Sequence, residues 1–302
     1  MTSAWPNLSD LLVPSDAEAP VGLIGAPLAA GSVTPGRCDL APGELRQVLR
    51  RIGRYDLDTR RELSTRVADH GDVPIEGLTI EAATAPLSEK VARSVARHAL
   101  TLLIGGNNAV TRPGLHGMAR ALQLDLSAVG LITLDAHFDM RDLDDGLGNG
   151  NPVRALREDG LPGAHVAQIG LAPFANSRTM HEDALAGGHL VITAREVRER
   201  GIGDAIARAL EQLEQCAAIA VDFDIDCIDR SQFPGAPGAR PGGLRVLDFF
   251  AAARRLAASP KVRLVDLTEW DPPLDPGDLS ALTAGRWMAE LLAGFERRLP
   301  AG

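Results

Sequence analysis

The sequence lacks the features that mark membrane, secreted and nucleic-acid-binding proteins. No segment reaches the roughly 18 consecutive apolar residues of a membrane-spanning helix, and residues 1–20 carry acidic side chains where a secretion signal needs basic ones. The three cysteines, Cys38, Cys216 and Cys227, show no Cys-x-x-Cys spacing, which favours free thiols in a reducing compartment. A net charge of −9 without a dense run of Lys or Arg argues against nucleic-acid and anionic-membrane partners. We therefore expect a cytoplasmic protein with no nucleic-acid or membrane partner.

The sequence does contain a regular alternation of apolar, β-rich runs and amphipathic segments. Of its 302 residues, 45% are hydrophobic and 24% are charged, so the chain can bury a full core. The expected strands cover 21–25, 67–72, 101–104, 129–134, 165–171, 190–192, 217–221 and 262–267. The expected helices cover 43–49, 87–100, 112–122, 204–215, 244–258 and 279–299. This order predicts a mainly parallel sheet covered by helices on both faces. We expect one α/β domain over residues 1–302, with residues 1–20 as an N-terminal extension.

Two acidic clusters each follow an expected buried strand. The first contains Asp135, His137 and Asp139, and the second contains Asp224 and Asp226. If the extended conformation continues, alternate side chains point the same way, so each set shares one face. Neighbouring carboxylates repel each other unless a cation lies between them. The pattern predicts a metal centre, most simply a binuclear one. The alternative is that these strands end in acidic residues only because they meet solvent.

Polar clusters follow four of the expected strands, at 105–108, 135–139, 222–229 and 268–272. The carboxyl ends of parallel strands meet at one edge of a sheet, where ligands bind in α/β folds. Four strand ends that converge on one edge are stronger grounds for a site than either acidic cluster alone.

These motifs resemble those of the ureohydrolase family, which comprises arginases, agmatinases and formimidoylglutamases. Residues 135–139 match the family's Asp-Ala-His-x-Asp, and 223–229 are similar to its Phe-Asp-x-Asp-x-x-Asp. Residues 269–272 match Glu-x-x-Pro, and 105–109 occupy the place of Gly-Gly-Asp-His-Ser. The resemblance spans most of the chain. It implies a single-domain, three-layer arginase-like fold and metal-dependent hydrolysis of a linear amidine or guanidine.

The resemblance also implies a ligand set for two Mn²⁺ ions bridged by a hydroxide. Asp135 and Asp224 would bridge both ions, Asp139 would serve the first, and His137 with Asp226 would serve the second. Mostly oxygen ligation suits Mn²⁺ better than Zn²⁺. The paired ions would lower the pKa of their shared water and so supply hydroxide at neutral pH.

Two further positions matter at this implied centre. Glu269 and Asp139 are the implied catalytic residues, with Glu269 accepting hydrogen bonds from the cationic amidine. Asn108 stands where the family has a histidine ligand to the first ion. An amide oxygen can bind a hard cation but is less basic than imidazole, so Asn108 is expected to be a weak ligand. The remaining histidines are expected at the surface or in loops: His70, His98, His116, His165, His181 and His189.

Three residues are candidates for binding the substrate. Asn149 begins a segment, Asn-Gly-Asn-Pro, that stands where arginases and agmatinases have His-Gly-x-Pro. Arg141 and Arg154 are candidates to hold substrate carboxylates, because guanidinium matches a carboxylate bidentately. Each of these arginines is equally consistent with a solvated loop residue.

The resemblance favours hydrolysis of N-formimidoyl-L-glutamate to L-glutamate and formamide by a homo-oligomeric enzyme. One alternative is a ureohydrolase that acts on a guanidino compound such as agmatine, guanidinobutyrate or arginine. The other is a metal-depleted relative that binds a ligand without catalysis, which the asparagine at position 108 suggests.

Overall fold

The computed structural model describes residues 5–298, and residues 1–4 and 299–302 lie outside that range. Within it, nine strands form one sheet. These are β1 (Leu12–Pro14), β2 (Val21–Ala26), β5 (Val67–Asp72), β6 (Leu100–Gly105), β7 (Val129–Leu134), β8 (Val166–Leu171), β9 (Leu190–Thr193), β10 (Ala218–Asp224) and β11 (Val262–Thr268). Strands β3 (Tyr55–Asp56) and β4 (Arg61–Glu62) form a separate antiparallel hairpin.

The α-helices of this range separate most of the strands. They are α1 (Ala41–Val48), α2 (Ile80–Arg97), α3 (Thr111–Leu122), α4 (Pro152–Glu158), α5 (Arg178–Ala186), α6 (Ala194–Arg200), α7 (Ile202–Gln212), α8 (Val246–Ala257) and α9 (Leu279–Phe295). Local sequence explains several of their ends. The side chains of Thr193 and Glu196 form a capping box at the start of α6, for example. None of the helices within residues 5–298 combines the length and apolarity needed to cross a bilayer.

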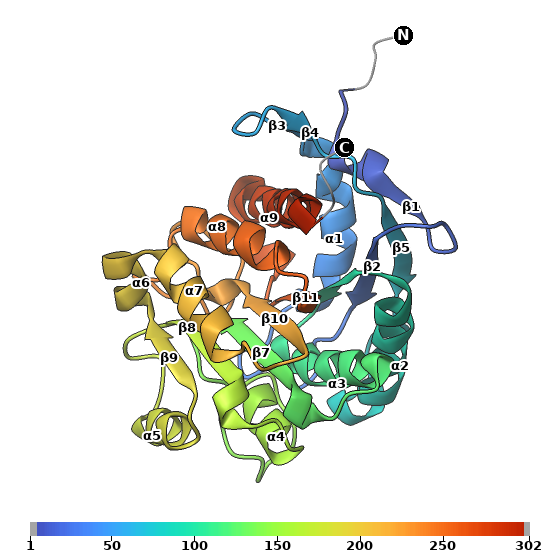
Figure 1. The fold of residues 1–302 in the computed structure, drawn as a ribbon. Helices are drawn as coiled ribbons and strands as arrows, with labels where there is room; N and C mark the ends of the chain where they lie inside the picture. Colours follow the sequence, from blue (N-terminus) through green and yellow to red (C-terminus); the bar gives the residue numbers. More distant parts are fainter. Residues whose placement is uncertain (1–4, 299–302) are drawn as a thin grey trace.

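The strand order is β1-β5-β2-β6-β11-β10-β7-β8-β9, and every pairing in this sheet is parallel. Strands β6, β11, β10 and β7 are therefore neighbours at the centre of the sheet. Because they run in one direction, the loops after all four emerge at the same edge (Figure 1). This arrangement brings together segments that are far apart in the sequence.

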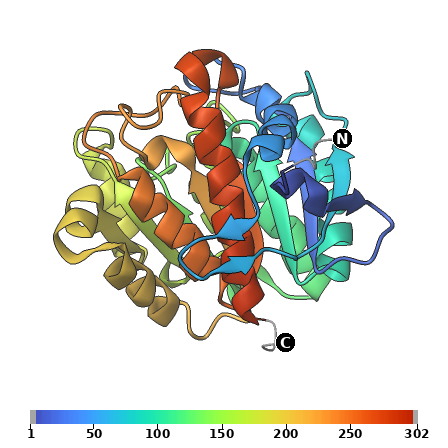
Figure 2. The same ribbon diagram turned by 90° about the horizontal axis from the view of Figure 1, so that it is seen from above.

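Helices cover the sheet on both faces, so the molecule has three layers (Figure 1). One hydrophobic core lies under α1, α6, α7, α8 and α9, and a second lies under α2, α3, α4 and α5. Alternation along β7 shows how one strand serves both cores, since Leu131 packs into the second while Ile132 and Leu134 pack into the first. Figure 2 shows α8 and α9 side by side over the sheet, with the β3–β4 hairpin near α9.

The predicted α/β architecture with a mainly parallel sheet is confirmed, and the differences have local causes. Helix α2 begins at Ile80 rather than at residue 87, because Pro86 lies inside it and proline normally breaks a helix. Helices α4, α5 and α6 were not expected. The closing helix was expected to reach residue 299; α9 ends at Phe295, and residue 299 lies outside the described range.

The expected N-terminal extension, residues 1–20, contributes to this architecture where it is described. Strand β1 pairs with β5 as the edge of the sheet. Leu8 and Leu11 are buried in the first core. Residues 5–20 therefore pack against the rest of the fold, and residues 1–4 lie outside the described part.

Candidate functional site

The four central strands bring their polar residues together at one edge of the sheet. Asn108 follows β6, Asp135 follows β7, Asp224 ends β10 and Glu269 follows β11. Each of these side chains is buried, with at most 5% of its residue surface exposed. Four buried polar groups at adjacent strand ends form the floor of the site.

The acidic residues come together through turns and not, as the sequence suggested, through alternation along a strand. Strand β7 ends before Asp135, whose Oδ1 accepts a hydrogen bond of 2.6 Å from the backbone N–H of His137. Strand β10 ends at Asp224, whose Oδ1 accepts one of 2.9 Å from the N–H of Asp226. These side-chain turns bend the chain immediately after each strand. The expectation of extended backbone was therefore wrong, although the residues do converge.

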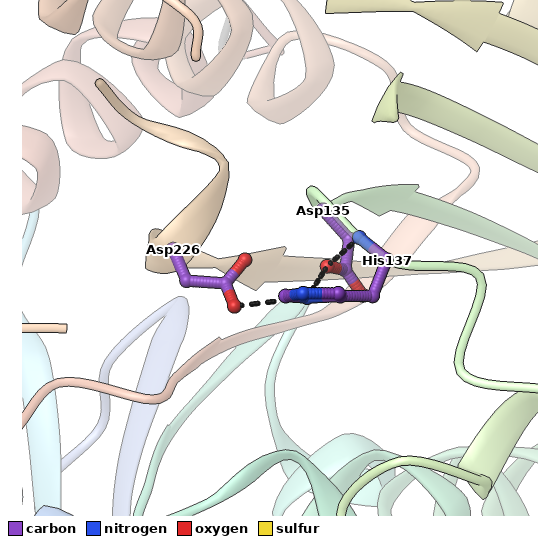
Figure 3. A group of neighbouring side chains, drawn as sticks. All are labelled: Asp135, His137 and Asp226. Carbon is purple, nitrogen blue, oxygen red and sulfur yellow. Dashed lines mark hydrogen bonds and ion pairs between the residues drawn. The ribbon is translucent and has the colours of Figure 1, made fainter. Parts of the chain in front are cut away.

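The convergence produces two groups of side chains that can each hold an ion. The histidine cluster consists of Asp135, His137 and Asp226, and the all-acid cluster consists of Asp135, Asp139 and Asp224. Within each cluster, one potential ligand atom per residue lies within 4.8 Å of the others. Figure 3 shows the histidine cluster, in which His137 Nδ1 is 3.0 Å from Asp226 Oδ2 and 3.5 Å from Asp135 Oδ1. Asp135 belongs to both clusters.

Burial and mutual repulsion shift the pKa values of these acids. Burial raises the pKa of Asp135 to about 6. Burial and the charge of Asp135 raise the pKa of Asp139 well above its usual value, and burial with the charge of Asp226 does the same for Asp224. Burial would lower the pKa of His137, but the neighbouring carboxylates, Asp226 foremost, raise it to about 12. Asp135 Oδ2 is buried without a hydrogen-bond partner in the described chain. Such a group of acids calls for cations.

Asn108 faces the all-acid cluster. Its Nδ2 donates a hydrogen bond of 2.5 Å to Asp139 Oδ2, and its Oδ1 accepts one of 2.7 Å from Thr111 Oγ1. Asp139 itself has a positive φ of 52°, a conformation that non-glycine residues rarely adopt and that often marks functional sites. The position at which the sequence departs from the family motif is thus in direct contact with an expected metal ligand.

Glu269 is held from two sides through a single oxygen. Its Oε1 accepts hydrogen bonds from the backbone N–H of Asn108 at 2.8 Å and from Asn149 Nδ2 at 2.9 Å. Burial raises the pKa of Glu269 to about 7, partly offset by these two donors. Its backbone also has a positive φ, of 62°. Asn149 in turn accepts a hydrogen bond from Val33 N–H, so both ends of its amide bind protein groups.

A cavity of about 450 Å³ opens above this floor. From the floor it is lined by His137, Asp139, Asp224, Asp226 and Glu269. Its outer part includes the candidate substrate ligands Arg141 and Asn149, together with Phe174 and Arg240. A cavity of this size accommodates a small-molecule substrate.

Arg154 does not line this cavity. Its Nη2 donates to Asp183 at 2.7 Å and to the carbonyl of Met140 at 3.4 Å, and it lines an adjoining cavity instead. The expectation that Arg154 holds a substrate carboxylate is therefore not supported by the geometry. The ion pair with Asp183, which lies on the unexpected helix α5, accounts for its direction.

Sequence reasoning missed the residues that hold the turn after β7. Two side-chain amides hold the Phe138 peptide, since Asn176 Oδ1 accepts from its N–H at 2.8 Å and Gln168 Nε2 donates to its carbonyl at 3.0 Å. Gln168 Oε1 pairs with His189 Nδ1 at 2.9 Å, and His189 Nε2 pairs with Arg157 at 2.7 Å. A glutamine inside an apolar strand was the available signal, because buried polar residues are uncommon.

The same chain corrects the placement of two histidines. His189 and His98 were expected at the surface or in loops, yet their exposed fractions are 6% and 4%. His98 Nδ1 pairs with the carbonyl of Ala19 at 2.8 Å, and its Nε2 pairs with His70 at the same distance. Because both rings find polar partners, burial costs them little.

Comparison with known proteins identifies relatives over nearly the whole chain. The arginase family model matches residues 19–294. A formimidoylglutamase of Halalkalibacterium halodurans is 29% identical, over 90% of this chain and 86% of its own. A guanidinopropionase of Pseudomonas aeruginosa is also 29% identical, over 90% of this chain and 85% of its own.

Solved structures give the same result. The crystal structure of a Bacillus subtilis formimidoylglutamase superposes with a TM-score of 0.90 at 27% identity, covering 97% of this chain and 93% of that one. A Trypanosoma cruzi formiminoglutamase crystallised with Mn²⁺ gives 0.88 at 26% identity, covering 97% and 99%. The resemblance inferred from the sequence motifs is thus confirmed, and with it the arginase-like fold.

Proposed function

The chain belongs to the arginase family, and on this premise we propose that it hydrolyses a C–N bond of N-formimidoyl-L-glutamate, releasing L-glutamate and formamide. The recurrence of formimidoylglutamases among its relatives and structural neighbours supports this substrate. The observation that carries the proposal is the placement of Glu269 in one cavity with residues of both acidic clusters. Water activation and amidine binding then occur side by side.

The residues present fit two Mn²⁺ ions. Four aspartates and one imidazole provide the oxygen-rich donor set that Mn²⁺ accepts. In this proposal the histidine cluster holds one ion and the all-acid cluster holds the other, with Asp135 and Asp224 shared between them. Two cations would balance the buried carboxylates and give Asp135 Oδ2 the partner it lacks among residues 5–298. Asn108 would contribute weakly, its amide turned so that oxygen replaces nitrogen beside Asp139.

The protein's own groups bind and orient the substrate. When bound, the ions supply activated water at neutral pH. Glu269 Oε1 is occupied by Asn108 and Asn149, so Oε2 is the oxygen placed to accept an N–H of the amidinium. Asp139 lines the cavity and would accept the proton that the attacking water gives up. Asn149 acts by positioning Glu269, since both ends of its amide are already bonded.

Hydrolysis of a guanidino compound is the second candidate, and the guanidinopropionase relative supports it. The same floor would bind a guanidinium, and the product would be urea instead of formamide. The two reactions differ at the outer part of the substrate, where formimidoyl-glutamate carries two carboxylates, guanidinopropionate one and agmatine none.

The proposal is tested by loading the purified protein with Mn²⁺ and measuring both products. Formimidoyl-glutamate, guanidinopropionate, guanidinobutyrate, agmatine and arginine would be compared at equal concentration, with formamide and urea assayed separately. We expect formamide from formimidoyl-glutamate to exceed urea from every guanidino substrate. Preferred turnover of a guanidino compound would establish the second candidate. Absence of turnover in a protein shown to bind Mn²⁺ would point to the non-catalytic relative.

A further inference from the structure

Two arginines line the outer part of the cavity without an acidic partner. Arg141 and Arg240 are both exposed, and neither has a carboxylate within 4.0 Å in the part of the chain that the structure describes. We propose that Arg141 and Arg240 each bind one carboxylate of the substrate, which makes the site selective for dicarboxylic amidines. This inference rests on the proposed function and adds Arg240, which the sequence motifs did not indicate.

Arg240 is held by its own loop in a way that leaves donors free. Its Nη1 donates to the carbonyls of Gly238 at 2.8 Å and Ala239 at 3.2 Å. No hydrogen bond from its Nε or Nη2 to residues 5–298 is found, so this edge of the guanidinium is available. The loop is also anchored at the floor, because a methyl group on Gly238 would overlap the Asp226 carboxylate. Arg240 is therefore fixed close to the reacting end of the cavity.

Arg141 is fixed by a different loop. Its backbone N–H donates to the carbonyl of Gly150 at 3.1 Å. Its side chain crosses the same glycine, since a Cβ at Gly150 would lie 2.8 Å from Arg141 Cδ and 3.0 Å from Nε. No side-chain hydrogen bond to the described residues ties up its guanidinium. The two arginines thus reach one cavity from separate loops, with their stems held and donors free.

Charge balance in the cavity favours a ligand with two carboxylates. Two divalent cations would offset the four aspartates of the clusters, and the amidinium would offset Glu269. The two guanidinium groups then remain, and each matches one carboxylate in the bidentate geometry that arginine provides. A ligand with one carboxylate leaves one guanidinium without a counter-charge, and agmatine leaves both. Selectivity follows because a polar group left unpaired in a closed site is unfavourable.

The test compares Arg240→Gln and Arg141→Gln with a matched control, Arg178→Gln. Arg178 is exposed, lies next to the cavity-lining Ser177 and does not itself line the cavity, so its replacement changes net charge equally. For formimidoyl-glutamate we expect each cavity variant to raise KM about 10- to 100-fold with kcat nearly unchanged, because the contact is made in ground and transition states alike. For agmatine, kcat/KM of the same variants should change by less than about twofold. The control should alter neither substrate.

Calorimetric binding of the product L-glutamate to the Mn²⁺-loaded protein gives a readout independent of turnover. Its affinity should fall in Arg240→Gln by about the same factor as KM rises, and 4-aminobutyrate, with one carboxylate, should bind wild type more weakly. Equal loss for every substrate, or an unchanged KM for formimidoyl-glutamate, would overturn the pairing. If wild type releases no formamide, the proposed function fails separately. L-Glutamate binding then decides, and an affinity unchanged in Arg240→Gln refutes the inference.

Discussion

The two acidic clusters share Asp135, yet the protein balances their charge differently. In the histidine cluster, His137 lies 3.0 Å from Asp226 and, with its pKa raised to about 12 mainly by that carboxylate, can carry the compensating positive charge. In the all-acid cluster the nearest donor to Asp139 is the neutral amide of Asn108. One cluster therefore has an internal counter-charge and the other has none.

This difference predicts unequal behaviour of the two ions. The first ion of the family site would occupy the all-acid cluster, where repulsion is strongest and Asn108 replaces an imidazole. The second would occupy the histidine cluster, where an imidazole nitrogen completes the ligands. Cation binding relieves more repulsion in the former but finds a stronger donor in the latter. Measurements of each ion separately would show which effect dominates.

Asp135→Asn tests the residue that both clusters share, and we expect the largest effect there. The change removes a carboxylate from both ions, so both should be lost on gel filtration without free Mn²⁺. Activity should fall at least about 100-fold, since even the loss of outer hydrogen-bond partners costs 10- to 100-fold at metal sites. Metal analysis together with formamide release checks this. Two tightly held ions with near-normal turnover would contradict the shared role of Asp135.

A matched pair, His137→Asn and Asp139→Asn, separates the clusters. Each variant alters one cluster only, so each should retain one Mn²⁺ with ordinary affinity and bind the other about 10- to 100-fold more weakly. Calorimetric titration of metal-free protein measures both sites. The division into two clusters fails if either variant weakens both sites equally.

Asn108→His is expected to strengthen binding at the all-acid cluster by about tenfold, because imidazole is the better donor to Mn²⁺. The histidine cluster is the internal control and should keep its affinity. The measurement is again a Mn²⁺ titration of metal-free protein. An unchanged affinity at both sites would mean that Asn108 is not a ligand and serves only the hydrogen bonds to Asp139 and Glu269 seen here.

The contrast between Arg154 and Arg240 shows where sequence reasoning reaches its limit. Motifs at strand ends were sufficient to locate Asp135 and Glu269, because a parallel sheet brings those ends to one edge. Arg154 was misassigned because its partner Asp183 lies on α5, a helix whose one buried residue, Ala184, gives no amphipathic pattern. Arg240 lies in a Pro- and Gly-rich loop without periodicity, so only the fold places it in the cavity.

The turn that joins the clusters should respond to acid through His189, with the smallest effect on the metals. Phe138 lies between His137 and Asp139, and its carbonyl is held by Gln168, which is paired with His189 Nδ1. Burial lowers the pKa of His189 to about 4, and the charges of Arg157 and Arg154 lower it further. Its Nε2 must stay unprotonated to accept from Arg157, so the ring is neutral in the folded protein.

The sign of the pH effect follows from that lowered pKa. The unfolded chain takes up this proton near pH 6.5, the folded one only near pH 4, so the contribution of His189 is complete above pH 6.5 and declines as the pH falls towards 4. Between pH 7 and pH 5 the loss should be about 2 kcal/mol. Urea unfolding of metal-free wild type and His189→Gln measures it, because the variant lacks this titration while all other acids remain. The stability difference between the two proteins should therefore shrink towards pH 5, with Mn²⁺ affinity at pH 7 changing only a few-fold. A difference that is constant with pH would show that the brace from Arg157 to Phe138 does not depend on a neutral His189.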